Sequence, residues 1–247
     1  MDPVGYFTEA VADTYDEDHG GTDPLLIEQT VDCLLDLTDG GSALEFAIGT
    51  GRIALPLAER GAPVKGIELS AAMVNKLREK EVGPPIEISI GDMTSTQISG
   101  DFSLVFLVFN TIYNLTTQQA QIDCFRNAAR HLRPQGRFLI ETLVPPIQKI
   151  PFGEKRRAFS SSRDHFGIDE FDVASQKFTS NHVWMKDGRH EYLSIPFRYA
   201  WPAELDLMAK IAGMSLEHRW SDWDRSPYDF TSDKHISVWR KHEDTQR

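Results

Sequence analysis

Two spacings of hydrophobic residues alternate along the first 145 positions of the chain. Short apolar runs between glycine, proline or aspartate predict buried strands, and stretches with apolar residues three and four apart predict helices. Such an alternation predicts a parallel, doubly wound α/β sheet. The stretch 43–61 is expected to form a strand, a turn and a helix, with further strands at 64–69, 86–90, 102–109 and 136–142 and helices at 25–37, 71–81 and 118–132.

The pattern changes after Pro145-Pro146. Residues 151 to about 199 hold a basic, polar loop and then two β-like runs on either side of Asp187-Gly188, which is a favoured two-residue hairpin turn. This turn fixes the register, because residues whose numbers sum to 375 then face each other. The pairs expected across the hairpin are Trp184 with Glu191, Val183 with Tyr192, and His182 with Leu193.

The C-terminal part returns to the earlier pattern. A helix is expected to begin near Pro202, which suits a first helical turn, and to stop at Gly213. Two last strands are expected at 215–220 and 235–240. We therefore predict one domain over all 247 residues, with a mostly parallel seven-stranded sheet, helices on both of its faces, and an antiparallel β insertion after strand five.

Charge and composition narrow the possible partners. Residues 1–51 hold twelve Asp and Glu and no Lys or Arg, so the whole net charge of -11 is N-terminal. Such a segment repels a phosphate backbone, and no basic stripe follows, which disfavours nucleic acid as a partner. The chain has no apolar run long enough to cross a membrane and no signal-peptide start, so a cytoplasmic location is expected. Cys33 and Cys124 are expected to be reduced core thiols, and no metal-ligand spacing is present.

The turn after the first strand raises the question of its ligand. Gly49-x-Gly51-x-x-Ala54 formally matches a dinucleotide fingerprint, with the acidic Glu68 seventeen residues past Gly51. A carboxylate at the end of a second strand accepts hydrogen bonds from the two hydroxyls of any nucleoside ribose. The turn and Glu68 alone therefore leave dinucleotides and other nucleosides open.

Three further features separate these ligands. Glu45 lies inside the first strand, Gly91-Asp92-Met93 closes the third strand, and Asn110 closes the fourth. Together with them, the segments ALEFAIGTGRIALPLA, KGIELS, IGDM, VFLVFNTIYNL and HLRPQGRFLIE resemble, in order over residues 40–145, the successive motifs of class I S-adenosylmethionine-dependent methyltransferases of the small-molecule type. No phosphate-seeking lysine follows the turn, which agrees with a cationic ligand that carries no phosphate.

The resemblance implies roles for individual residues. Gly49 and Gly51 would face the methionine part of S-adenosylmethionine, Glu68 the ribose and Asp92 the adenine, with Met93 packed on the ring. Two positions depart from the family's pattern, because Ala47 stands at the first glycine and Gln135 replaces a frequent glycine before strand five. The full set expected around the cofactor is Tyr15, Glu45, Ala47, Gly49, Thr50, Gly51, Arg52, Glu68, Leu69, Asp92, Met93 and Asn110.

The acceptor side is expected on the insertion and near the N-terminus. His182 and Tyr113 are the candidates for acid–base work, although methyl transfer by in-line displacement does not require a protein base. The alternatives are that the histidines are surface residues, that Trp184 belongs to a small core under the hairpin, and that Lys155-Arg156-Arg157 is a solvated loop. The residues expected to bind substrate are Tyr6, Tyr113, Asn114, Trp184 and Arg198.

The segments then take provisional roles as an N-terminal helical lid (1–39), a cofactor-binding core (40–145), a substrate-side β insertion (146–199), and a C-terminal helix with a final β hairpin (200–247). The predicted function is methyl transfer from S-adenosylmethionine to a nitrogen, oxygen or carbon atom of a small molecule, by a monomer or homodimer. Two alternatives stay open at this stage: a nicotinamide-dependent oxidoreductase, and a non-catalytic protein that binds S-adenosylmethionine.

Overall fold

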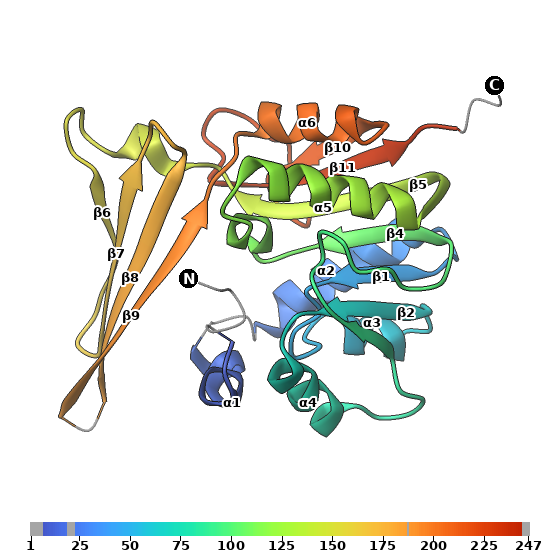
Figure 1. The fold of residues 1–247 in the computed structure, drawn as a ribbon, viewed down its shortest axis with the longest axis horizontal. Helices are drawn as coiled ribbons and strands as arrows, with labels where there is room; N and C mark the ends of the chain where they lie inside the picture. The colour runs from blue at the N-terminus through green and yellow to red at the C-terminus, as the bar shows by residue number, and fades with distance from the viewer. Residues whose placement is uncertain (1–6, 19–22, 187, 244–247) are drawn as a thin grey trace.

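A computed structural model describes residues 7–18, 23–186 and 188–243. Its larger sheet, sheet A, has the strand order β10-β11-β5-β4-β1-β2-β3. Strands β1 to β5 are parallel, and β11 runs antiparallel to both of its neighbours, which confirms the predicted seven-stranded, mostly parallel sheet (Figure 1). Its strands are β1 Ala43–Phe46, β2 Val64–Glu68, β3 Glu87–Ile90, β4 Phe102–Leu107, β5 Leu132–Leu143, β10 Met214–Trp220 and β11 Lys234–Lys241.

Helices cover both faces of sheet A because its central strands are apolar on both sides. Every residue of β1 and β4 is buried, as is usual for central parallel strands. Residues of α2 and α3 share one apolar core with one face of β4, and residues of α5 and α6 share a second core with the other face. The helices are α1 Glu9–Asp18, α2 Pro24–Thr38, α3 Ala54–Glu59, α4 Ala71–Lys80, α5 Gln118–His131 and α6 Pro202–Ile211.

Local signals in the sequence account for the helix ends. The Ser70 side chain accepts from the backbone N–H of Met73 at the start of α4, and Thr117 caps α5 in the same way. Pro202 stands in the first turn of α6, as expected. The chain reverses after that helix at Gly213, whose φ of 78° favours glycine.

The insertion differs from its prediction in extent. The predicted polar loop contains a strand, and a second unpredicted strand follows it, so that four strands form a separate antiparallel sheet, sheet B, in the order β6-β7-β8-β9. Alternation in these two strands is interrupted by glycine and serine, which weakens their pattern. The register of the last hairpin is confirmed for all three predicted pairs. The strands are β6 Arg156–Ser161, β7 His165–Asp172, β8 Lys177–Lys186 and β9 Arg189–Arg198.

Sheet B stands beside the carboxyl ends of the parallel strands, toward which the arrows of β4 and β5 point in Figure 1. Helix α1 lies on the same side of the molecule, against α4. In the order of sheet A, β1 lies between β2 and β4, so the chain crosses over at this position. Ligands of doubly wound sheets bind outside the strand ends at such a crossover.

Cys33 and Cys124 are free and buried, in agreement with their prediction as core thiols. Within the described ranges, no helix is both long and apolar enough to cross a membrane. The same ranges contain no group of three His, Cys, Asp or Glu residues arranged to hold a metal ion.

Candidate active site

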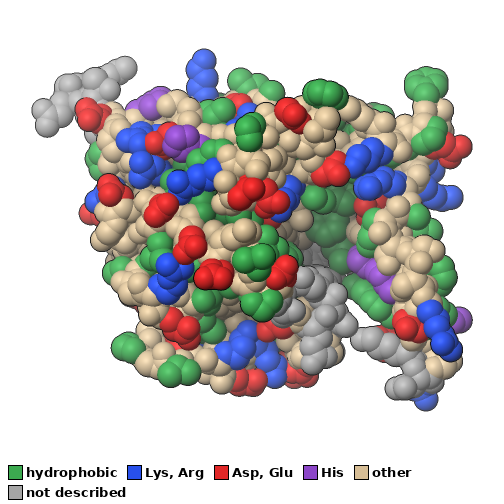
Figure 2. Space-filling model, turned by 180° about the vertical axis from the view of Figure 1, so that it is seen from behind, with side chains coloured by type: hydrophobic (Ala, Val, Ile, Leu, Met, Phe, Trp, Pro, Cys, Tyr) green, Lys and Arg blue, Asp and Glu red, His purple; other side chains and the backbone are tan. Residues whose placement is uncertain are grey.

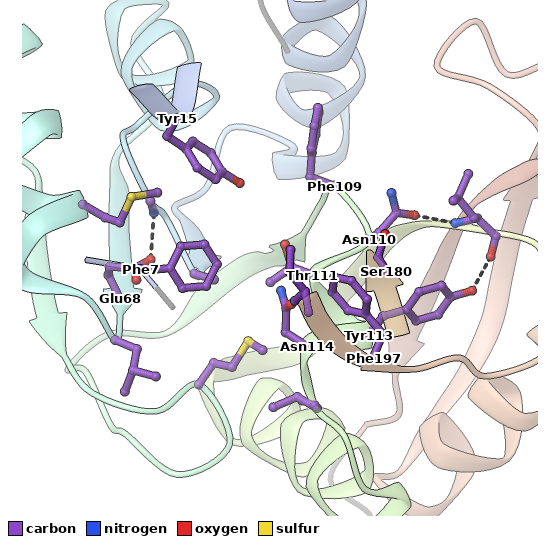
Figure 3. A pocket seen from close by; sticks show the side chains of 18 of the residues that line it. Phe7, Tyr15, Glu68, Phe109, Asn110, Thr111, Tyr113, Asn114, Ser180 and Phe197 are labelled. Atoms are coloured by element: carbon purple, nitrogen blue, oxygen red, sulfur yellow. Dashed lines mark hydrogen bonds between the residues drawn. The ribbon is translucent and has the colours of Figure 1, made fainter. Parts of the chain in front are cut away.

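A cavity of about 450 Å³ lies between the strand ends of sheet A, helix α1 and the inner face of sheet B. Its size is typical of small-ligand sites. Figure 2 shows the hollow between the body of the molecule and sheet B, with apolar side chains in its depth and histidine side chains on the wall that sheet B forms. Figure 3 shows how one end gathers Phe7, Tyr15 and Glu68, whereas the other gathers Tyr113 and Phe197.

The turn after β1 lines the first end of the cavity. Ala47 and Gly49 face the cavity and have φ values of 51° and 59°. Ala47 thus adopts the left-handed conformation for which the family uses glycine, at a cost of roughly 1–2 kcal/mol. Gly51 serves packing instead, because a Cβ there would meet the Leu77 side chain of α4 at 2.7 Å. Neither Gly51 nor Thr50 lines the cavity.

Glu68, at the end of β2, is positioned by backbone donors on both sides. Its Oε2 accepts from the N–H of Gly49 and its Oε1 from the N–H of Ser70, both at 2.9 Å. The residue is 5% exposed. Burial raises the pKa of Glu68, and the backbone N–H groups of Ser70, Gly49 and Leu69 oppose that rise. A carboxylate has about four acceptor positions, so two remain for a ligand in the cavity.

The third strand supplies a second acid to the same end. Leu69, Asp92 and Met93 all line the cavity, as predicted for them. Asp92 accepts from the N–H of Thr94 at 2.7 Å, which fixes the turn that follows β3. Two carboxylates without a basic partner on the cavity wall suit a cationic ligand that carries no phosphate. The basic residues and histidines among those that line the cavity are Arg157 and His182, both on sheet B.

Glu45 and Arg52 lie beneath this end rather than on its surface, since neither lines the cavity. Glu45 is 4% exposed, and its Oε2 has no hydrogen-bond partner among the described residues. Burial raises the pKa of Glu45 well above its usual value. The Arg52 guanidinium lies 3.3 Å from the ring centroid of Phe109, and burial lowers its pKa. Arg52 therefore supports the Phe109 ring, which does line the cavity.

Helix α1 closes the first end of the cavity with Phe7, which precedes the helix, and with Tyr15. Asp16 joins the helix to two other elements, because it accepts from the Thr50 hydroxyl at 2.6 Å and pairs with Lys80 of α4 at 2.7 Å. The Ser70 hydroxyl also donates to the backbone carbonyl of Phe7 at 2.8 Å. Tyr6, predicted to bind substrate, lies outside the described residues.

The end of β4 supplies the middle of the cavity. Asn110, Tyr113 and Asn114 line it, as predicted. The Asn110 Oδ1 accepts from the N–H of Leu143 at 2.7 Å, and the Tyr113 hydroxyl donates to the Leu143 carbonyl at 2.5 Å (Figure 3). Burial raises the pKa of Tyr113 above its usual range. Tyr113 therefore keeps its proton at neutral pH and does not act as a base.

Sheet B forms the second end of the cavity through alternate residues that share one face. Three rows cross its strands. Phe171, Phe178 and Phe197 form an aromatic row, Arg157, Asp169, Ser180 and Ile195 form a polar row, and Gly167, His182 and Leu193 form the next row. Sequence reasoning identified His182 and missed the polar row, for which the period-2 pattern of β7 was the available signal. Residues not predicted for the site that line the cavity are Phe7, Phe109, Arg157, Phe159, Asp169, Phe178, Ser180, Ile195 and Phe197.

Two residues predicted to bind substrate lie outside the cavity wall. Arg198 is buried at the end of β9, where it pairs with Glu204 at 2.7 Å and donates to Gln121. Its guanidinium is thus committed to joining β9 with α5 and α6. Trp184 stacks on His182, with ring centroids 4.9 Å apart, and on His165, at 5.0 Å. The Trp184 indole therefore packs against the histidines and does not form the cavity surface.

Known proteins with similar sequences and structures share one activity in their descriptions. A family model described as a methyltransferase domain matches residues 43–136. The CcbJ methyltransferase from Streptomyces caelestis is 33% identical, with a TM-score of 0.83 over 94% of this chain and 96% of its own. A cypemycin N-terminal methyltransferase from a Streptomyces species is 27% identical over 183 residues, which are 72% of this chain and 74% of that protein. The S-adenosylmethionine-bound structure of CalS10 from Micromonospora echinaspora is 16% identical, covers 96% of this chain and 98% of its own, and has a TM-score of 0.70, so it shows the fold alone.

Proposed function

Because the chain belongs to the S-adenosylmethionine-dependent class I methyltransferases, we propose that it methylates an amine nitrogen of a small molecule. This membership makes S-adenosylmethionine the cofactor and removes the nicotinamide alternative. The observation that carries the choice of nitrogen is the Asp169 carboxylate, which lines the acceptor end of the cavity beside aromatic side chains. A carboxylate among aromatic rings suits a protonated amine.

The acids at the first end of the cavity support the cofactor's placement there. We assign Glu68 to the ribose hydroxyls, Asp92 to the adenine amino group, and the backbone at Ala47 and Gly49 to the methionine part. When bound, S-adenosylmethionine supplies an electrophilic methyl group on a sulfonium. We also assign a lid role to α1, because Phe7 and Tyr15 line this end.

Asp169 has the properties that an amine acceptor needs. Burial raises its pKa, whereas the Ser180 hydrogen bond and the charge of Arg157 oppose the rise. An ammonium must lose one proton before its lone pair attacks, and a carboxylate whose pKa is raised is a better acceptor for that proton. An alcohol needs a much stronger base, so this wall favours nitrogen over hydroxyl oxygen. The cypemycin N-terminal methyltransferase and an aminosugar N,N-dimethyltransferase from Streptomyces fradiae carry nitrogen acceptors in their names.

The test combines acceptor screening with one isosteric variant. Labelled-methyl transfer is measured on pairs of small molecules that differ only in an amine or a hydroxyl, and amines are expected to be methylated preferentially. On an accepted amine, Asp169→Asn should lower kcat/KM by about tenfold to a hundredfold, because one charge-assisted contact is worth about 1.5–3 kcal/mol. Affinity for S-adenosylhomocysteine should not change.

Glu170→Gln is the matched control, since Glu170 lies next in β7 on the opposite face, paired with Lys155 and Arg156. It should leave kcat/KM unchanged. Methylation of hydroxyl partners alone, or wild-type turnover by Asp169→Asn, would contradict the proposal. No transfer to any compound would favour the non-catalytic alternative. The cytoplasmic location, the absence of nucleic-acid partners, and the choice between monomer and homodimer stay predictions.

A further inference from the structure

A chain of hydrogen bonds leads from the acceptor end of the cavity toward the rim of sheet B. The Ser180 hydroxyl bonds the Asp169 carboxylate and lies 3.2 Å from Nε2 of His182. Nδ1 of His182 lies 3.0 Å from Nε2 of His165, whose Nδ1 lies 2.9 Å from the Ser160 hydroxyl. We propose that this chain is a proton relay, which carries the proton of the acceptor amine from Asp169 to Ser160. The proposal rests on amine methylation as proposed above.

The geometry of the two imidazoles suits transfer between them. Their planes differ by only 20°, and their facing nitrogens are much closer than their ring centroids, which are 5.2 Å apart. The rings therefore meet edge to edge, with the hydrogen bond close to the plane of both. Trp184 stacks on both rings, and an aromatic face stabilises an imidazolium that forms against it.

Phe159 packs against the same pair. Its ring centroid lies 5.2 Å from that of His182 and 6.1 Å from that of His165. Gly167 leaves the space that this ring fills, because a Cβ there would lie 2.3 Å from Phe159 atoms. Aromatic packing of this kind limits the access of water to the imidazoles along their length. Protons are therefore directed along the hydrogen bonds toward the strand edge.

The proton count balances at each link. One proton leaves the ammonium for Asp169 and passes through the Ser180 hydroxyl to Nε2 of His182. The Nδ1 proton of His182 then moves to Nε2 of His165, and the Nδ1 proton of His165 moves to the Ser160 hydroxyl. One proton has entered and one is passed to solvent at the rim, where Ser161 and Ser162 are exposed. Each imidazole ends neutral with its tautomer exchanged, and it is reset when the next proton passes or when the ring exchanges with solvent.

The charges around the pair define its titration. Among described side chains on this face of sheet B, the charged groups are Arg157 on β6, Asp169 on β7 and Glu191 on β9, and β8 adds only His182 itself. Two cationic imidazoles cannot share the 3.0 Å hydrogen bond, because each would then present a donor. The pair is therefore expected to titrate in two separate steps, with at most one positive charge near neutral pH.

His165→Ala tests the relay, since His165 does not line the cavity. On an amine that the wild type methylates, the variant's turnover at pH 7 should fall about tenfold or more, at unchanged affinity for S-adenosylhomocysteine. Added imidazole should restore turnover. The defect should also disappear at a pH above the pKa of the amine, where the acceptor arrives without its extra proton. His190→Ala, at an exposed position of the same sheet, is the control and should match the wild type.

A structural role for His165 would instead lower turnover at every pH and resist imidazole. That result would overturn the relay and leave amine methylation standing, since the wild type tests methylation separately. Nitrogen-15 spectra of the histidines give a readout that needs no acceptor. They should show two titration steps for His165 and His182 in the wild type and a shifted His182 step in His165→Ala. Independent titration of the two rings would also overturn the proposal.

Discussion

Glu68→Gln isolates the charge of one carboxylate while it keeps the size of the side chain. In the structure, each Glu68 oxygen accepts one backbone N–H, from Gly49 and from Ser70. A glutamine can accept from only one of them, and its NH₂ group then faces a second donor. The variant also presents a neutral group to the ribose hydroxyls. We therefore expect weaker binding of S-adenosylmethionine by a protein that still folds.

The magnitude follows from the number of contacts. A hydrogen bond to a charged group is worth about 1.5–3 kcal/mol, and about 1.4 kcal/mol corresponds to a factor of ten in affinity. Loss of one such contact therefore predicts an affinity lower by about tenfold to a hundredfold. The unsatisfied donor at Gly49 or Ser70 adds to the loss, because both amides lie beside the binding site.

Calorimetric titration with S-adenosylhomocysteine measures this change, and circular dichroism checks the fold. Glu87→Gln on the neighbouring strand β3 is the control, since Glu87 is exposed and pairs only with Lys65 among the described residues. A surface pair of this kind contributes about 0–1 kcal/mol, so its loss should leave the affinity unchanged. Wild-type affinity in a folded Glu68→Gln protein would refute the assignment of Glu68 to the ribose.

Two further predictions concern the lid and the core. Asp16→Ala removes the links from α1 to Thr50 and Lys80, so release of S-adenosylhomocysteine should be about twofold to fivefold faster in stopped-flow displacement; an unchanged rate would contradict the lid. Burial lowers the pKa of His235 from 6.5 to about 3, so the unfolded chain takes up the extra proton below pH 6.5. Stability is therefore lost as the pH falls, by about 2 kcal/mol between pH 7 and pH 5, and chemical denaturation of His235→Gln should lack this part of the loss.

The cofactor end could be predicted because its residues follow the strand ends of a regular α/β pattern. Glu68, Asp92 and Asn110 each come directly after a strand, and a parallel sheet brings such positions to one edge. Glu45 and Arg52 belong to the same motif, yet they lie beneath the surface. The motif identifies such residues without distinguishing those that face the ligand from those that support the wall.

The acceptor end could be predicted only in part, because it depends on two strands whose pattern is weak. Without β6 and β7, neither Arg157 nor Asp169 can be placed on a common face with Ser180. The register of the last hairpin was deducible from its turn, and with it the proximity of His182 and Trp184. Arg198 was misplaced because a buried arginine near a cavity and a buried arginine in an ion pair look alike in sequence.

The rows that cross sheet B separate the choice of acceptor from the binding of the cofactor. A substitution in the row formed by Arg157, Asp169, Ser180 and Ile195 changes one band of the cavity wall without moving a residue of sheet A. Because side chains of the two faces alternate, the outward neighbours of these four positions can stay constant and keep the strands paired. A small combinatorial library at these four positions is thus a compact means of redirecting the enzyme toward new amines. Thermal stabilisation by S-adenosylhomocysteine would identify the members that still fold and bind cofactor.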